Sequence, residues 1–225
     1  MKPNHAQRNR QGITIVEVLV CVVVVVLLLG FLLPRSGGEK FKASRISCVS
    51  RLKQIGLASR MWANDNPGQF PWQVSMTASN PGTQEFALTG DVWKHFLAIS
   101  KELNNPKILA CPSDKSRTPV SDWASFTNNA HLSYFVGLDA SEVFPQSILS
   151  GDRNLTVSNK AAQGILFLKP GDTLGWTKAL HEGQGNFGLG DGSVQQINSG
   201  HSANRQLEAA FQSATQSVIR ISLPQ

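Results

Sequence analysis

Cysteine is scarce in this sequence: the 225 residues contain three, and Cys21 lies inside a long apolar run. Small secreted domains that rely on disulfides contain many more, so a disulfide-dense scaffold is excluded. One pair, Cys48 and Cys111, remains available for bonding. These two residues either form a disulfide, if this part of the chain is exported to an oxidising compartment, or are buried as small hydrophobic side chains.

The sequence also lacks a stripe of basic residues interleaved with aromatics. The net charge is +6, but three of the basic residues, Lys2, Arg8 and Arg10, lie in the first twelve positions. Nucleic-acid-binding domains usually concentrate Lys and Arg on one face of the fold. We therefore expect no nucleic acid among the partners of this chain.

A cleavable secretory signal is disfavoured as well. The apolar run at 13–33 contains 21 residues, of which only Thr14 and Glu17 are plainly polar. A helix of this length is about 30 Å long, which matches the hydrocarbon core of a bilayer. The run is longer than the apolar part of an ordinary signal peptide, and no A-x-A site follows it. The sequence therefore predicts a transmembrane helix at 13–33.

A carboxylate inside such a run needs an explanation, because charged groups within a membrane are costly and often functional. Around Glu17 the sequence reads Gly-Ile-Thr-Ile-Val-Glu-Val after a short basic leader. This order resembles the class III signal of type IV prepilins and type II secretion pseudopilins, in which glycine and a hydrophobic residue precede T-L-I-E-L. The resemblance implies cleavage after Gly12 and N-methylation of Ile13, where the family more often has phenylalanine. It also implies that Glu17 pairs with the amino terminus of a neighbouring subunit.

A second stretch, CVSRLKQIGLASRMWANDNPGQFP at 48–71, is similar to a pattern of pilin-like proteins of planctomycete and verrucomicrobial type. That pattern is C-x-x-N-L-K-Q-I-G-L-A followed by Y-x-N-D-x-x-G-x-F-P. Arg51 stands where the pattern has asparagine, and Trp62 stands where it has tyrosine. The apolar residues before and within this stretch share one face of a predicted amphipathic helix.

The third informative stretch is HEGQGNFGLGDGSVQQI at 181–197, in which nine residues separate His181 from Asp191 and Gly192. It resembles the H-x9-D-G box of the same pilin-like family. Asp-Gly favours the positive φ of tight turns, so 186–189 and 193–197 are predicted to pair as a hairpin.

A cation site is a second interpretation of this box. Pseudopilins of other branches bind calcium in this region, so His181 and Asp191 are candidates for a site that holds a cation. Calcium prefers six or more oxygen ligands. Only Asp191, Asp172, Glu182 and nearby carbonyls are available here, so we predict neither a metal nor another cofactor.

Enzymatic motifs are missing from the same region. The glycines at 183, 185 and 188 have dinucleotide-binding spacing, but no βαβ pattern surrounds them. His181, Asp191 and Ser193 do not lie near a nucleophile elbow. The sequence therefore predicts that the protein is not an enzyme.

The remaining patterns predict one α+β domain. Helices are expected at 92–103 and 202–214, and strands at 108–110, 132–138, 165–168 and 218–223. The predicted organisation is a leader peptide at 1–12, the transmembrane helix at 13–33, its amphipathic continuation at 34–66 and a globular domain at 67–225. The expected fold is pilin-like, with a long N-terminal helix packed by its C-terminal half on a small antiparallel sheet.

The resemblance implies a structural function. The chain would be a pseudopilin that prepilin peptidase processes and that polymerises with identical or related subunits into a type II secretion pseudopilus or a related filament. It would cross the bacterial inner membrane once and place its globular domain on the periplasmic side. The alternative is an exported enzyme or ligand-binding domain held by an uncleaved signal anchor.

Overall fold

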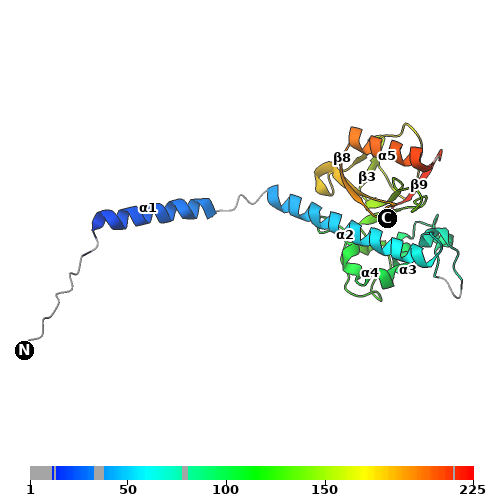
Figure 1. The fold of residues 1–225 in the computed structure, drawn as a ribbon, viewed down its shortest axis with the longest axis horizontal. Coiled ribbons are helices and arrows are strands. Elements are labelled where there is room, and N and C mark those ends of the chain that lie inside the picture. The colour runs from blue at the N-terminus through cyan, green and yellow to red at the C-terminus, as the bar shows by residue number, and fades with distance from the viewer. Residues whose placement is uncertain (1–11, 13, 33–37, 78–80, 215) are drawn as a thin grey trace, which may run out of the picture. The chain divides into compact units, whose positions relative to one another are not determined.

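The computed structural model describes residues 12, 14–32, 38–77, 81–214 and 216–225. It divides the chain into two compact units, residues 1–40 and 41–225, which are described separately below. Figure 1 shows the fold, with several of the elements labelled by their number in chain order.

The described part of the first unit is dominated by one helix, α1, which covers Ile15–Leu32. Thr14 and Glu17 are joined by hydrogen bonds at its start. The backbone N–H and the hydroxyl of Thr14 donate to Oε2 of Glu17, at 2.8 Å and 2.9 Å. The N–H of Glu17 donates to the hydroxyl oxygen of Thr14 at 3.4 Å. This reciprocal arrangement is that of a capping box, which satisfies N–H groups at a helix start. Glu17 therefore has a local partner as well as the intersubunit role that the resemblance implies.

The predicted transmembrane helix at 13–33 is described only in part, because residues 13 and 33 lie outside the described positions. Within the described residues, no helix is long and apolar enough to qualify as a membrane span. The helix α1 has 18 residues. At 1.5 Å per residue it is about 27 Å long, slightly less than the 30 Å expected for the full run.

The helix α2, Gly38–Asp65, is the longest of the described helices. The predicted apolar stripe is confirmed over its described side chains, because Cys48, Leu52, Ile55 and Trp62 are all buried. After Asp65 the N–H of Gly68 donates to the Ala63 carbonyl, and Gly68 has a φ of 72°. Glycine adopts this left-handed conformation without strain, so it ends the helix where the sequence predicted.

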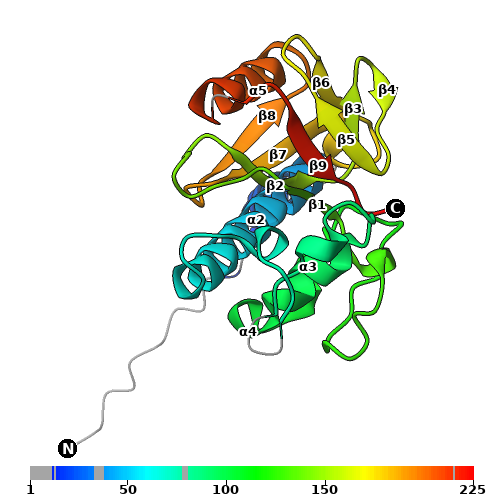
Figure 2. The same cartoon turned by 90° about the vertical axis from the view of Figure 1, so that its right-hand side faces the viewer.

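A six-stranded antiparallel sheet, in the order β5-β9-β1-β2-β7-β8, forms the centre of the second unit. Figure 2 shows it with α2 on one side and α5 on the other. Its strands are β1 (Tyr134–Gly137), β2 (Ile148–Asp152), β5 (Ile165–Leu168), β7 (Gln184–Leu189), β8 (Val194–Asn198) and β9 (Ile219–Ser222). A three-stranded sheet contains β3 (Leu155–Val157), β4 (Lys160–Ala161) and β6 (Leu174–Trp176). The expected α+β class, with an N-terminal helix on an antiparallel sheet, is confirmed.

The large sheet separates two hydrophobic cores. Tyr134 and Val136 of β1 belong to the core that contains the buried face of α2, whereas Phe135 belongs to the core beneath α5. Successive side chains of a strand point to opposite faces, which explains this division. The helices α3 (Val92–Ala98) and α4 (Ser100–Leu103) lie on the α2 side, and α5 covers His201–Ala214.

Several sequence predictions require correction. Residues 108–110 were expected to form a strand, but Pro106–Leu109 form the 3-10 helix η3, because Asn105 caps its start by accepting from the Lys107 N–H. The helix expected at 92–103 is divided at Ile99 into α3 and α4. Strands β2, β3, β4 and β6 were not predicted. The other 3-10 helices are η1 (Pro71–Gln73), η2 (Gln84–Phe86), η4 (Asn129–His131) and η5 (His181–Gly183).

Candidate functional site

The H-x9-D-G box forms the hairpin of β7 and β8 and the turns at its two ends. Gln184 pairs with Asn198 at the open end, and Gly188 pairs with Val194 near the tip. At the tip the N–H of Gly192 donates to the Leu189 carbonyl, and Gly192 has a φ of 82°. The hairpin turn predicted at Asp191 and Gly192 is therefore present.

The tip of this hairpin rests on α2. Arg60 of the helix donates through Nη1 to the carbonyl of Asp191 at 2.8 Å, and its Nε is paired with Glu142 at 3.0 Å. A Cβ at Gly56 would lie only 3.3 Å from Cα of Gly192. The close approach of the two backbones thus accounts for Gly56 in the stretch at 48–71.

Replacing Gly56 by leucine should separate the tip from the helix. The larger side chain has no room against Gly192, and overpacking of this kind typically costs about 1 to 3 kcal/mol. We expect the free energy of unfolding, measured by denaturant titration, to fall by about 2 kcal/mol.

Lys53→Leu is the matched control, because it introduces the same side chain at an exposed position of the same helix. It should change the free energy of unfolding by less than about 0.5 kcal/mol. Equal effects of the two variants would show that the contact between Gly56 and Gly192 is not tight.

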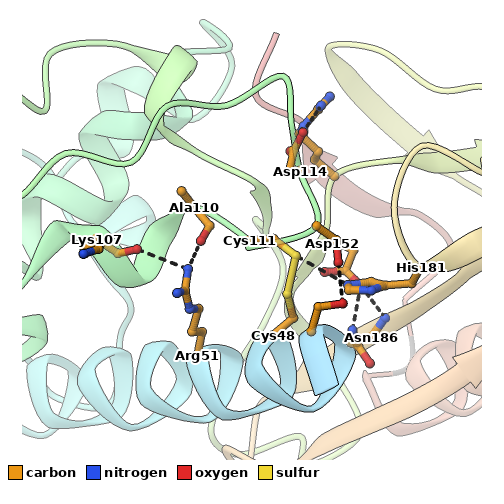
Figure 3. Close-up of a disulfide and its surroundings, with 12 residues drawn as sticks. Cys48, Arg51, Lys107, Ala110, Cys111, Asp114, Asp152, His181 and Asn186 are labelled. Atoms are coloured by element: carbon orange, nitrogen blue, oxygen red, sulfur yellow. Dashed lines mark hydrogen bonds and ion pairs between the residues drawn. A yellow bond between two sulfur atoms is a disulfide. The ribbon is translucent and has the colours of Figure 1, made fainter. Parts of the chain in front are cut away.

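The first turn of the box lies beside a disulfide, shown in Figure 3. Cys48 of α2 is bonded to Cys111, with Cα atoms 5.7 Å apart, and Nε2 of His181 lies 3.5 Å from the Cys111 sulfur. All three side chains are buried. The pair that the sequence left open is therefore joined, and the box histidine is packed against it. Within the described part of the chain, these residues form the one group of three potential metal ligands.

A fully buried carboxylate completes this cluster. Oδ2 of Asp152, from the central strand β2, lies 3.8 Å from Nε2 of His181 and accepts from the N–H and side-chain amide of Asn186, at 2.9 Å and 2.8 Å. Burial raises the pKa of Asp152 to about 7, against the hydrogen bonds from Asn186 and the charge of Arg45. Burial, assisted by Arg45, lowers the pKa of His181 to about 4. The imidazole is thus neutral at pH 7, and its contact with Asp152 is not an ion pair.

Two arginines of α2 support the surroundings of the cluster. Arg45 donates through Nη2 to the carbonyls of Gly185 and Ile197, at 3.2 Å and 3.3 Å, and through Nη1 to Gln184. It therefore holds the open end of the hairpin. Arg51 stands where the pattern quoted for residues 48–71 has asparagine. It donates to the carbonyls of Lys107 and Ala110, just before Cys111 (Figure 3).

The structure does not bring all predicted site residues together. His181 and Asp191 lie at opposite ends of β7, whose six residues span about 20 Å. A cation site shared by these two residues is therefore not formed. Asp172 accepts from the N–H of Lys169 within its own turn, and Glu182 is exposed. Gly12 is exposed, and Ile13 lies outside the described residues.

Sequence reasoning missed Asp152, Asn186 and Arg45. Asp152 follows Ser150 and Gly151, a combination typical of turns, yet these residues form a central strand. A Cβ at Gly151 would lie 2.7 Å from both the Asn186 carbonyl and the Phe135 ring, so only glycine fits there. The glycines of the box indicate a hairpin, whereas no local pattern indicates β2.

Comparison with known proteins identifies no relative of this chain. No protein-family model, no curated protein and no solved structure matches it significantly.

Proposed function

We propose that this chain is a prepilin-like structural subunit. Prepilin peptidase removes residues 1–12, the apolar segment at 13–33 holds the subunit in the inner membrane, and the mature chain assembles into a type II secretion pseudopilus or a related filament. The observation that carries this proposal is the order of residues from Gly12 to Glu17 at the start of an apolar helix. The proposal assigns the chain no enzymatic activity.

The exposed surface of α1 supports the proposal. Many large apolar side chains of this helix are exposed by half or more, and Val18, Leu19 and Leu27 are between half and two-thirds exposed. An apolar surface of this extent does not remain in water, so lipid or another protein must cover it. Before assembly, lipid covers this surface while the subunit is inserted in the membrane. After assembly, the helices of neighbouring subunits cover it.

The way in which α2 is attached to the second unit also suits a filament subunit. The disulfide and Arg51 fix the helix to the segment at Ala110 and Cys111, and Arg45 and Arg60 fix it to the hairpin of β7 and β8. The H-x9-D-G box contributes both ends of its hairpin to this attachment. A load applied to α2 would therefore be passed to the sheet through several bonds. The disulfide is consistent with an extracytoplasmic position of this unit, because disulfides persist in oxidising compartments.

Processing tests the proposal directly. In a bacterium that contains prepilin peptidase, the mature chain should begin at Ile13 and carry an N-methyl group. Gly12→Val should block this step, because a peptidase that accepts glycine before the scissile bond has no room for a branched side chain. Intact-mass and N-terminal peptide analysis of membrane extracts measure both forms.

Gly30→Val is the matched control, because it changes a glycine within α1 and leaves the cleavage sequence intact. It should be processed like the natural chain. Full conversion of the Gly12→Val chain to the short form would contradict the proposal. An uncut natural chain that remains in the membrane would instead favour an exported enzyme or ligand-binding domain on a signal anchor.

A further inference from the structure

The disulfide does not explain the polar groups buried around it. Among the described residues, Oδ1 of Asp152 and Nδ1 of His181 have no hydrogen-bond partner, although both residues are more than nine-tenths buried. Buried polar groups are normally satisfied, and a disulfide in a hydrophobic core needs no carboxylate or imidazole beside it. The presence of a carboxylate and an imidazole beside the buried bond therefore requires another explanation.

The backbone also holds His181 in an unfavourable conformation. His181 and the next residue, Glu182, have φ values of 49° and 55°, in the left-handed region that non-glycine residues seldom adopt. Such residues often occur at functional sites, where the surrounding structure fixes a side chain in one orientation. Here the conformation places Nε2 against the Cys111 sulfur.

The two sulfurs and the imidazole nitrogen of this cluster are close enough to share one ion. The sulfurs of Cys48 and Cys111 and a ring nitrogen of His181 lie within 4.8 Å of one another. Oδ2 of Asp152 is 3.8 Å from Nε2 of His181 and is oriented by Asn186. Cysteine sulfur, histidine nitrogen and carboxylate oxygen are all ligand types of four-coordinate zinc, and the asparagine supplies the outer hydrogen bonds that orient a ligand.

We propose that reduction of the Cys48–Cys111 bond converts this cluster into a binding site for one zinc-class divalent ion. The ligands are the two cysteine thiolates, Nε2 of His181 and one carboxylate oxygen of Asp152. The same atoms thus have two exclusive states, because sulfurs bonded to each other are not thiolates. Calcium is excluded as the occupant, because the site offers too few oxygens.

The charges and the chemistry of this conversion balance. A phosphine reductant breaks the S–S bond to give two thiols and becomes a phosphine oxide with oxygen from water. Zinc binding then releases both thiol protons, and the proton of any Asp152 carboxyl that is still protonated, to solvent. The charges of two thiolates, one carboxylate and the dication sum to −1. The positive charge of the Arg45 guanidinium, which acts on Asp152, offsets this net charge. The occupied site therefore does not bury an uncompensated charge.

Metal analysis of the full chain in detergent tests this assignment. All samples carry Cys21→Ser, which removes the exposed free thiol. After reduction, anaerobic removal of the phosphine and incubation with zinc sulfate, elemental analysis should find about one zinc per chain in the reduced form and less than about 0.1 in the oxidised form. Cobalt in place of zinc should give the visible absorption of a tetrahedral thiolate complex.

Two variants test the ligands that are not cysteines. His181→Gln and Asp152→Asn should each weaken zinc binding by about tenfold or more. His201→Gln changes a surface histidine and should have no effect. The disulfide should still form in each oxidised variant, which serves as the check of the fold.

The stability of the reduced chain gives a second readout. Zinc should raise its unfolding midpoint and should leave that of the oxidised chain unchanged. The assignment is overturned if the reduced chain binds no more zinc than the oxidised chain, or if both ligand variants bind as tightly as the natural sequence. It is equally overturned if reduction unfolds the chain and zinc does not restore the fold.

Discussion

Glu17→Ala is expected to enter the membrane and to be cut after Gly12, but to be recovered in filaments at about one-tenth of the natural level or less. The substitution makes the apolar run more apolar and leaves the cleavage sequence unchanged. It removes the carboxylate that would pair with the amino terminus of a neighbouring subunit. In surroundings of low dielectric such a pair attracts strongly, and an amine left without it is costly.

The capping box at Thr14 gives Glu17 a rival role, and a second substitution separates the two. Glutamine serves at this position of a capping box, so Glu17→Gln preserves the helix cap but lacks the charge. Thr14→Ala weakens the cap and preserves the charge. If intersubunit pairing is the function, Glu17→Gln should fail to assemble and Thr14→Ala should succeed; the capping role predicts the opposite.

Cleavage and assembly should be measured on the same samples, by mass analysis and by cross-linking between neighbouring subunits. Normal cross-linked ladders from the Glu17→Ala chain would refute the pairing role. Loss of both cleavage and ladders would indicate failed insertion, which the pairing role does not predict.

Replacing Cys48 and Cys111 together by alanine should lower the free energy of unfolding by about 4 kcal/mol. The bond joins residues 63 apart in the chain and therefore restricts a long loop of the unfolded state. It also ties α2 to the segment that follows η3. Arg51 contacts the same region, because it donates to the carbonyls of Lys107 in η3 and of Ala110 just after it. Without the bond, Arg51 and the hydrogen bond from Ser113 to Ser44 still link the two segments.

Denaturant titration in the presence of a chelator measures this effect without a contribution from bound metal. The natural chain under reducing conditions should approach the stability of the double variant, because both lack the covalent link. Cys21→Ser, which removes a free and exposed thiol, should leave stability unchanged within about 0.5 kcal/mol. A loss below about 1 kcal/mol in the double variant would show that the non-covalent contacts of α2 are sufficient.

The parts of the fold that were predicted correctly depend on residues adjacent in the chain. The buried stripe of α2 repeats at helical spacing, α5 covers nearly the predicted residues, and β5 and β9 are short apolar segments between turn residues. The turn at Asp191 and Gly192 follows from the conformational freedom of glycine, so the hairpin could be predicted with its partner strands. In each case the sequence of one segment contains the information that the structure requires.

The candidate site could not be predicted in this way, because its residues converge from four separate segments. The sequence offered Cys48, Cys111 and His181 individually, but provided no measure of the distances between them. Asp152 lies in a segment that resembles a turn, and it becomes a strand only because β2 is placed between β1 and β7.

The sequence by itself determined the apolar N-terminal segment with its single carboxylate, the amphipathic helix that follows and the hairpin of the H-x9-D-G box. Only the tertiary structure decided that the two ends of this box contact α2 at different places, one at the disulfide and the other at Gly56 and Arg60. The physical reason is that periodicity and turn preference act over a few neighbouring residues. The burial of Asp152 against His181 depends instead on the order in which distant strands join the sheet.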